Sequence, residues 1–330
     1  MNSILHQKNE ELKVLIVSSG NSGIIPTFVE EQALELAKLN VEIQHFLIKG
    51  NGAYGYLKNR SKLLNAIQEF APDIIHAHYG LSGLLANLQR IVPVITTYHG
   101  SDINDKFPFL LSKLTMFLSK FNIFVSKKLA IKAKAKHNFS IVACGIDMSL
   151  TKVVDKDEAI QIMHLQKNTK NILFSASFDN KNKNYKLAKA AIDLLLADSI
   201  AINLIELKGY SREKVNLLMN AVDCILVTSL KESGPLVIKE AMAVNNLAVS
   251  VDVGDVSEVF GNLKGYYIST YTPKDIAENI KLAFNFPLKT RGRDRIKELG
   301  LDSKTVALKI LSIYQYVINN RKQNHNKTHY

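Results

Sequence analysis

Short apolar runs alternate with longer stretches in which apolar residues recur at helical spacing, and this alternation covers most of the chain. In the first half, the runs of strand length are 13–18, 41–48, 73–77, 94–98 and 123–126, and the helical stretches include 27–39 and 61–70. In the second half, the strands are 171–175, 202–208, 224–228 and 247–251, and the helices are 185–196, 212–221 and 235–244. Short apolar strands separated by helices predict βαβ units, and therefore parallel sheets covered by helices on both faces.

The alternation is interrupted once, by a polar stretch at 148–170. A chain of 330 residues exceeds the usual size of one hydrophobic core, so two domains are expected. We therefore predict an α/β protein with two doubly wound, Rossmann-like domains, 1–150 and 151–303, facing an interdomain cleft. Residues 304–330 are predicted to form a helix that bridges the domains, followed by a basic tail.

The composition is that of an ordinary globular protein, with 47% hydrophobic and 22% charged residues, which excludes a disordered or fibrous chain. The formal net charge of +12 favours an anionic partner such as a nucleotide, a nucleic acid or a membrane surface. The two cysteines, Cys144 and Cys224, are far apart, so neither a disulfide framework nor a structural zinc site is expected. Residues 1–13 lack the features of a secretory signal, and no apolar run reaches membrane-spanning length. We expect a soluble, cytoplasmic protein that can still touch a membrane.

Three loops that follow predicted strands hold the candidate functional residues, and the first is Ser19–Gly23. Open parallel sheets bind ligands at the carboxyl ends of their strands, where this loop is predicted to lie. Its glycines would let the backbone approach a ligand, and the amides at the next helix start could hold a phosphate. The sequence SGNSG matches neither the dinucleotide fingerprint nor the P-loop, so a plain turn is the alternative.

The second loop follows the strand at 94–98 and contains His99. A histidine at a strand end suits a hydrogen bond to a substrate hydroxyl; the alternative is a loop histidine, with Asp102 capping the next helix. His76 and His78 end the preceding strand. Because no nearby cysteine or glutamate completes a ligand set, we expect this pair to brace the cleft rather than to bind a metal.

The third loop leads from Glu232 to Glu240, with the sequence ESGPLVIKE. Pro235 is expected in the first turn of a helix whose free amides would point toward the cleft. Such amides can hold a diphosphate or a sugar, and Glu240 could accept two hydrogen bonds from a ribose diol. The alternative is that Glu240 lies on the helix surface, paired with a lysine.

Taken together, the three loops resemble glycosyltransferase family 4, whose members are retaining enzymes with the two-domain GT-B fold. The resemblance covers nearly the whole chain. The matching segments are HAHYGLSGLLA (76–86), VITTYHGSD (94–102), VACGID (142–147), KGYSREKVNLLMNAVDCILVTS (208–229) and ESGPLVIKEAMA (232–243). The E-x7-E spacing followed by Ala-Met-Ala is the most specific of these.

The resemblance implies three catalytic residues. His99 would contact the transferred sugar near its anomeric carbon. Lys183 would neutralise the leaving diphosphate, and Glu232 would face the sugar and the diphosphate. No cofactor and no metal are implied, since the nucleotide sugar is a substrate.

The resemblance also implies a set of donor-binding residues. Glu240 would bind the ribose of the nucleotide sugar, and Gly20 would approach the phosphate from the N-terminal domain. The other implied donor-binding positions are Ser177, Gly234, Pro235 and Leu236.

Ser177 marks a departure from the family pattern. The family usually has Gly-Arg-Leu where this chain has Ala176-Ser177-Phe178, so the arginine partner of Lys183 is missing. Losing such a clamp can cost several kcal/mol of transition-state stabilisation. Three outcomes are open: compensation by Lys183 with Lys181, slow turnover, or lost activity. We expect compensation, because the other site residues persist.

The activity that the resemblance implies is the retaining, metal-independent transfer of a hexosyl or N-acetylhexosaminyl group from a UDP- or GDP-linked sugar. The acceptor would be a glycan or a lipid-linked glycan in the synthesis of cell-surface polysaccharide. Asp155-Lys156-Asp157, an Asp-x-Asp motif, lies in the polar stretch and follows no strand, which disfavours a metal site there. A nucleotide-sugar 2-epimerase of related fold and a non-catalytic nucleotide-sugar-binding protein are the alternatives. No nucleic-acid-binding motif is present, so no nucleic acid partner is expected.

The positive charge is concentrated between Lys106 and Ile146, where eight lysines and no acid occur. The stretch 106–121 also carries Phe, Leu and Met between its lysines. This composition is typical of an interfacial membrane helix or of a binding face for an anionic, lipid-linked acceptor. A solvated helix that covers the sheet is the alternative. We predict a peripheral contact of Lys106–Lys136 with an anionic membrane, at the inner face of the plasma membrane.

Overall fold

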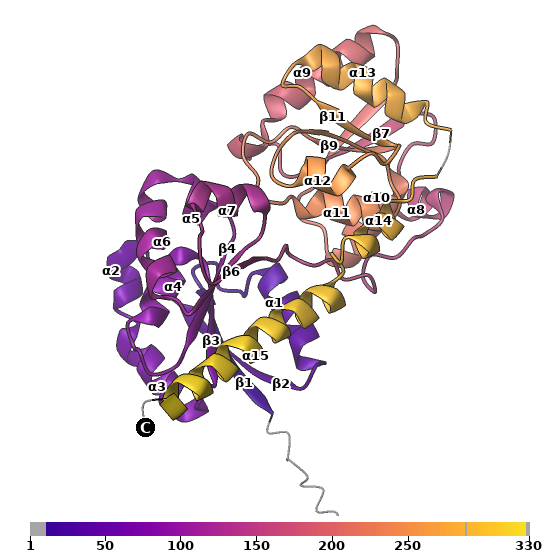
Figure 1. The fold of residues 1–330 in the computed structure, drawn as a ribbon. Helices are drawn as coiled ribbons and strands as arrows, with labels where there is room; N and C mark the ends of the chain where they lie inside the picture. The colour runs from indigo at the N-terminus through magenta and orange to yellow at the C-terminus, as the bar shows by residue number, and fades with distance from the viewer. Residues whose placement is uncertain (1–10, 288, 328–330) are drawn as a thin grey trace, which may run out of the picture. The chain divides into compact units, whose positions relative to one another are not determined.

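The computed structural model describes residues 11–287 and 289–327 (Figure 1). Contacts within the chain divide it into two compact units. The first unit comprises the chain up to Val125, Leu129–Val142 and the chain from Ala307 onward; the second comprises Ser126–Lys128 and Ala143–Val306. Each unit holds one parallel sheet, which confirms the prediction of two doubly wound α/β domains. The domain limits predicted at residues 150 and 303, and a cleft between the domains, stay predictions.

The first unit is built on a six-stranded sheet in the order β2-β1-β3-β4-β5-β6, with every neighbouring pair parallel. Its strands are β1 (Leu12–Ser19), β2 (Val41–Ile48), β3 (Ile74–His78), β4 (Val94–Tyr98), β5 (Phe121–Phe124) and β6 (Phe139–Ile141). Its helices are α1 (Thr27–Ala37), α2 (Gly52–Leu57), α3 (Arg60–Phe70), α4 (Gly80–Asn87), α5 (Ser101–Asn104), α6 (Lys106–Leu118) and most of α7 (Lys127–Ala133) and α15 (Ser303–Lys327). β3 and β4 are buried along their whole length, as strands covered on both faces must be.

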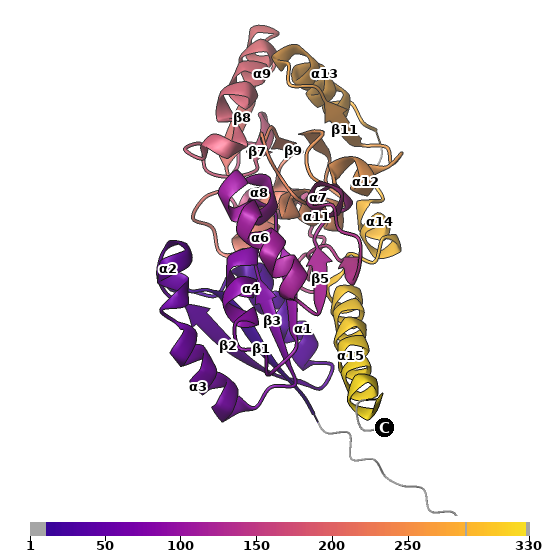
Figure 2. The ribbon, with the colours of Figure 1, turned by 60° about the vertical axis from the view of Figure 1, so that its left-hand side comes forward.

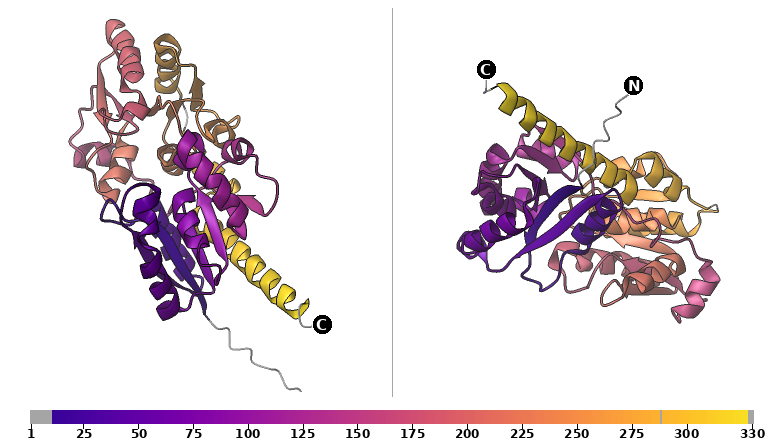
Figure 3. Two further views of the ribbon diagram at one scale, coloured as in Figure 1. Left: turned by 90° about the vertical axis from the view of Figure 1, so that its left-hand side faces the viewer. Right: turned by 90° about the horizontal axis from the view of Figure 1, so that it is seen from below.

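The second unit is built on a five-stranded sheet in the order β11-β10-β9-β7-β8, again parallel throughout. Its strands are β7 (Lys170–Phe174), β8 (Ile202–Glu206), β9 (Cys224–Val227), β10 (Ala248–Val251) and β11 (Tyr266–Ser269). Its helices are α8 (Lys156–Ile162), η1 (Lys181–Lys183), α9 (Tyr185–Ala197), α10 (Arg212–Ala221), α11 (Leu236–Ala243), α12 (Val256–Phe260), α13 (Pro273–Phe284) and α14 (Gly292–Glu298). Helices α9 and α13 lie side by side against the sheet (Figures 1 and 3).

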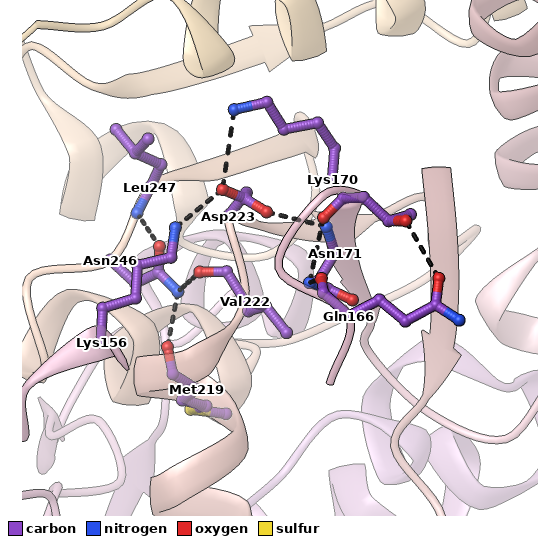
Figure 4. A network of polar contacts seen from close by, with 10 residues as sticks. Lys156, Gln166, Lys170, Asn171, Met219, Val222, Asp223, Asn246 and Leu247 are labelled. Carbon is purple, nitrogen blue, oxygen red and sulfur yellow. Dashed lines mark hydrogen bonds and ion pairs between the residues drawn. The ribbon is translucent and has the colours of Figure 1, made fainter. Parts of the chain in front are cut away.

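Helix α8 corrects the interpretation of 148–170 as a purely polar stretch. Asp155 caps this helix, because its carboxylate accepts hydrogen bonds from the amides of Asp157 at 2.9 Å and Glu158 at 3.1 Å. The helix is tied to the sheet through Asp223, whose carboxylate accepts from Lys156 Nζ and from the Asn171 amide, each at 2.7 Å (Figure 4). The Asp-x-Asp motif is therefore a helix start.

Helix α6 packs against α4 through small and hydroxyl-bearing residues (Figure 2). Its fully buried side chains are Ser112 and Thr115. Because a Cβ at Gly80 would lie 2.0 Å from Ser112 Oγ, and one at Gly83 would lie 2.6 Å from Thr115 Cγ2, the two helices need both glycines to approach this closely. Four of the larger apolar residues of α6, Phe107, Leu110, Leu114 and Phe117, are exposed.

Helix α15 begins at Ser303, one residue before the predicted start at 304, and it continues to Lys327. From Ala307 onward it belongs to the first unit. Tyr314 is fully buried there, and its hydroxyl lies 2.6 Å from Nδ1 of His76. The role of this helix as a bridge stays a prediction. Among the helices in the described ranges, none combines the length and apolar character needed to cross a bilayer.

Candidate functional site

The glycine-rich loop after β1 is shaped by its contact with β2. The Gly20 amide donates to the Ile48 carbonyl at 2.8 Å, and a Cβ at Gly20 would lie 2.8 Å from Leu47 Cβ. Asn21 fixes the same loop by accepting from the Gly50 amide at 2.8 Å. The glycine is thus required by packing, and since its own amide is engaged, a phosphate here would have to be held by other groups of the loop.

Three histidines form a stacked column at the carboxyl ends of β3 and β4. The ring centroids of His76 and His78 are 4.6 Å apart, and those of His78 and His99 are 5.2 Å apart. Nδ1 of His78 lies 3.0 Å from Nε2 of His99, so one imidazole donates to the other and fixes its orientation. The structure thus brings together the three histidines that sequence reasoning placed at two strand ends.

The column is held in the neutral form by its surroundings. Loss of hydration lowers the pKa of His76 and of His99 to about 3, and lowers the pKa of His78 well below its usual value. Both nitrogens of His76 are engaged, Nδ1 with the Tyr314 hydroxyl and Nε2 with Thr97 Oγ1 at 2.7 Å. His76 therefore has no nitrogen left for a metal ion, and within residues 11–287 and 289–327 no three His, Cys, Asp or Glu side chains form a metal-holding group.

Asp102 supports the loop that carries His99. Its carboxylate accepts from the amides of Gly100 at 2.8 Å, Gly80 at 3.2 Å and His99 at 3.3 Å. Burial raises the pKa of Asp102 to about 6, against the opposing effect of these hydrogen bonds. The carboxylate therefore ties the start of α4 to the His99 loop, in addition to lying in the first turn of α5.

Two aromatic residues that sequence reasoning missed surround His99. The rings of Phe28 and Tyr79 have centroids 4.6 Å and 4.7 Å from the His99 ring. Tyr79 adopts a φ of +71°, a conformation that non-glycine residues rarely adopt and that clusters at functional sites. A strand-end tyrosine gives no sequence signal of this backbone conformation, since glycine or asparagine is the residue that usually marks it.

In the second unit, Lys183 and Glu232 meet. Lys183 Nζ lies 2.7 Å from Glu232 Oε1, and both side chains are largely buried. The backbone of Lys183 is also fixed, because its carbonyl accepts from Thr228 Oγ1 at 2.9 Å. Two of the predicted catalytic residues, separated by 49 positions in sequence, thus form one ion pair.

Glu240 is buried on α11, with 6% of its surface exposed, and is paired with Arg212 on α10. The alternative of a surface glutamate paired with lysine is therefore wrong on both points. Pro235 is the N-cap of α11, and the helix begins at Leu236. The Ile238 amide donates to the Pro235 carbonyl at 3.2 Å, whereas the amides of Leu236 and Val237 precede the first bond of the helix and are available to an anionic ligand.

A buried ion pair that sequence reasoning missed lies beneath the loop before α11. Lys239 and Asp255 are 2.7 Å apart, with side chains 1% and 8% exposed. A Cβ at Gly234 would lie 2.9 Å from Asp255 Oδ2, so the loop rests on this pair. Gly254, at φ +57°, packs its backbone against Ser233 in the same way. A lysine in a helix gives no sequence signal of burial.

Ser177, at the position where an arginine was expected, lies beside an exposed ion pair. Its hydroxyl is 3.4 Å from Asp179 Oδ2, and that oxygen is 3.0 Å from Lys208 Nζ. The side chain of Asn182, next to Lys181 in η1, donates to the Lys231 carbonyl. Lys208 is thus a further cation near Ser177, which the family pattern did not point to.

Two family models match this chain. Residues 11–150 match the model described as Glycosyltransferase Family 4, and residues 200–298 match the model described as Glycosyl transferases group 1. A curated relative is TuaC of Bacillus subtilis (strain 168), named on a provisional assignment as a teichuronic acid biosynthesis glycosyltransferase. It is 24% identical over 239 residues, which are 64% of this chain and 61% of TuaC. The chain therefore spans less than two thirds of that relative's length.

Solved structures share the fold. Sucrose-phosphate synthase from Thermosynechococcus elongatus matches with a TM-score of 0.80 at 14% identity, over 94% of this chain and 100% of that chain. HepE of Anabaena, solved in complex with UDP, matches with a TM-score of 0.70 at 16% identity, over 92% of this chain and 100% of that chain. With two parallel-sheet α/β units in the chain, this likeness shows the GT-B architecture.

Proposed function

Because residues 11–150 match the Glycosyltransferase Family 4 model and residues 200–298 match the Glycosyl transferases group 1 model, we propose that this chain transfers a sugar from a nucleotide diphosphate sugar to an acceptor hydroxyl. The transfer proceeds with retention at the anomeric carbon, through an oxocarbenium-like transition state. The acceptor is a glycan or a lipid-linked glycan of the cell surface. The name of TuaC, which assigns it to teichuronic acid biosynthesis, supports this placement.

The single observation that carries the proposal is the arrangement around α11. A buried carboxylate, Glu240, lies along the helix, free amides lie at its start, and the Lys183–Glu232 pair precedes it. A nucleoside diphosphate needs a carboxylate for its ribose diol, and a cation with helix-start amides for its phosphates. UDP is the nucleotide named with HepE, which supports a UDP-linked donor; a GDP-linked donor is the alternative.

Charge on the leaving diphosphate is met by Lys183 and the α11 amides, without a metal ion. Lys183 is paired with Glu232 in the structure, so donor binding has to share or displace that pair. Lys208 and Lys181 supply the second positive charge in place of the arginine that Ser177 replaces. Glu232 faces the sugar and, by its own charge, opposes unproductive binding of a second anion beside Lys183.

His99 contacts the transferred sugar, and the column behind it sets its orientation. A neutral imidazole can donate from one nitrogen and accept at the other, which suits a sugar hydroxyl. The low pKa of His99 keeps that neutral form at physiological pH. Phe28 and Tyr79, packed on the same ring, offer apolar faces beside it.

Helix α6 supplies the peripheral membrane contact of the proposal. Phe107, Leu110, Leu114 and Phe117 are exposed, with Phe117 at 84%, and they recur at helical spacing on one side of the helix. Lysines flank this ridge, and residues 106–146 contain eight lysines and no acidic residue. An apolar ridge with basic flanks favours an anionic membrane surface, which is where a lipid-linked acceptor is held.

A screen of nucleotide sugars that measures released nucleoside diphosphate tests the function and identifies the donor. With the donor found, Glu240→Ala raises KM for the nucleotide sugar because the ribose loses its acceptor. Lys183→Ala lowers kcat by about 10²–10³, the usual effect of removing one group that stabilises developing charge. Activity unchanged by a chelator is expected.

Lys189→Ala is the matched control, since Lys189 is an exposed lysine of the same unit that pairs with Asp193 on its own helix. Full activity in both site variants would refute the site. Donor binding without turnover on any acceptor would favour the non-catalytic alternative that Ser177 motivates. Formation of an epimer from donor alone would favour the 2-epimerase.

A further inference from the structure

A cavity lies in the first unit, away from the histidine column. Its volume is about 640 Å³, within the usual range of ligand pockets. The wall includes Val94, Lys120 and Asn138, which lie at or directly before the starts of β4, β5 and β6. The cavity is therefore at the amino ends of these strands, whereas His78 and His99 lie at the carboxyl ends of β3 and β4. One five-residue strand separates the two edges by about 15 Å.

The charge of the cavity has one sign. Arg90, Lys120 and Arg321 line it, and no Asp or Glu is among the lining residues that the structure describes. Each guanidinium is held at one point: Arg90 Nη1 donates to the Leu118 carbonyl at 3.5 Å, and Arg321 Nη2 donates to the Ile91 carbonyl at 3.2 Å. A guanidinium has five N–H donors, so the rest are left for a ligand.

The uncharged part of the wall favours a ligand rich in hydroxyl groups. The carboxamides of Asn138, Asn320 and Gln323 line the cavity and can each donate and accept hydrogen bonds. The half-exposed ring of Tyr316 presents a flat apolar face, and Phe121 holds it edge-on at a centroid distance of 5.8 Å. Amides that bond hydroxyls, beside an aromatic face, are groups that suit a sugar ring.

The loop that forms one wall is built for this position. Gln89 closes it by accepting from the amides of Ile91 at 2.6 Å and Val92 at 2.8 Å, while its own amide donates to the Val92 carbonyl at 2.8 Å. Arg90, in this loop, adopts a φ of +61°, which is uncommon for a residue with a side chain. The cavity wall is thus preorganised before any ligand binds.

We propose that this cavity binds an anionic oligosaccharide whose sugars carry carboxylates. Guanidinium groups match planar carboxylates with two parallel hydrogen bonds, the amides bond the hydroxyls, and Tyr316 stacks on a ring. An inorganic phosphate ion would fill only a small part of the volume. Resting on the proposed function, the cavity holds an earlier segment of an acidic acceptor chain while its end is extended elsewhere.

Calorimetric titration of the full chain with trigalacturonate, without donor, tests the proposal. Maltotriose, inorganic phosphate and vesicles containing anionic phospholipid are the comparison probes. We expect trigalacturonate to bind at least tenfold more tightly than maltotriose, with an affinity that falls as salt is raised. The double variant Arg90→Gln/Arg321→Gln is expected to lose at least tenfold in affinity. Arg60→Gln/Lys62→Gln, which removes the same charge from α3, is expected to keep the affinity.

Equal binding of trigalacturonate and maltotriose, or an equal loss in both double variants, would overturn the proposal. The proposal would also be overturned if the Arg90/Arg321 variant lost phosphate or vesicle binding but kept trigalacturonate binding, because that result would assign the cavity to a phosphate or to a lipid headgroup. Donor turnover by the unaltered chain is measured separately. Absent turnover with intact trigalacturonate binding contradicts the proposed function and leaves the cavity assignment standing.

Discussion

The buried pair Lys239–Asp255 gives the sharpest test of how the donor loop is held. Lys239→Met keeps most of the side-chain volume but leaves Asp255 as a buried carboxylate without its partner. Removing one member of a buried pair costs about 3–5 kcal/mol, mostly because the remaining charge is uncompensated. Because the Gly234 backbone rests on both side chains, this cost falls on the loop before α11.

The double variant Lys239→Met/Asp255→Leu removes both charges together. Replacing a buried ion pair by apolar residues of similar size is often neutral or stabilising, so most of the loss is expected to return. Such recovery would show that the loss in the single variant comes mainly from the uncompensated buried charge, rather than from the lost attraction between the two side chains. A loss that persists in the double variant would indicate that packing around Lys239 matters more than its charge.

Hydrogen exchange measured by mass spectrometry suits this chain, because it has no tryptophan and two compact units whose unfolding need not be concerted. A loss of about 3 kcal/mol speeds exchange of the 233–244 amides by about two orders of magnitude, up to the limit set by global unfolding of the unit. Lys189→Met, which breaks an exposed pair, is the control and should change exchange by less than about threefold. The reasoning fails if both single variants behave alike.

Two further predictions follow from the same structure. Gly254→Ala should weaken donor binding, because Gly254 has a φ of +57° and an added Cβ would lie 2.8 Å from the Ser233 carbonyl carbon. Gly209→Ala is the control, because Gly209 has a similar φ of +77° but open space around it. KM for the donor is measured for both variants. Acidification should destabilise the first unit. Between pH 6.5 and about 4 the unfolded chain protonates His76, His78 and His99, whereas the folded unit keeps them neutral, so the free energy of unfolding falls as the pH falls. Asp102 acts in the opposite direction: its pKa is raised to about 6, so the folded unit takes up one proton there before the unfolded chain does, which offsets one of the three histidine protons. Hydrogen exchange of first-unit peptides at pH 7 and pH 5 measures this loss of stability. The second unit is the internal reference, because its histidine, His164, is exposed. Equal acid sensitivity of both units would contradict the prediction.

Nine of the eleven strands in the described ranges were predictable because buried parallel strands are short apolar runs, and their observed limits lie within about two residues of the predicted ones. The two edge strands β6 and β11 were missed, because each is short and only partly buried. Helix α8 was missed because its apolar positions are few and its main support is Asp223, which comes from a distant part of the sequence. The spacing of apolar residues reveals a helix face that packs on a core, but it does not reveal a helix that is held by a single polar contact such as that of Asp223 with Lys156.

The site was predictable only in part, for a related reason. His99, Lys183, Glu232 and Glu240 stand in loops, or in the helices that directly follow them, whose position relative to strands is readable, so a motif could identify them. Their pairing is a matter of distance: nothing in sequence links Lys183 to Glu232, or Arg212 to Glu240. The support beneath the loop, Lys239, looks in sequence like any exposed helical lysine.

The inner face of α6 has a consequence for how this chain can vary. Since Ser112 and Thr115 meet Gly80 and Gly83 almost without clearance, enlarging any one of the four requires a compensating reduction in its neighbour. The outward phenylalanines and leucines are under no such constraint, because folding does not use them. A saturation library selected for folding alone should therefore accept polar replacements at Phe107 and Phe117 while rejecting them at the glycines, and any selection that retains the aromatic residues reports on a task other than folding.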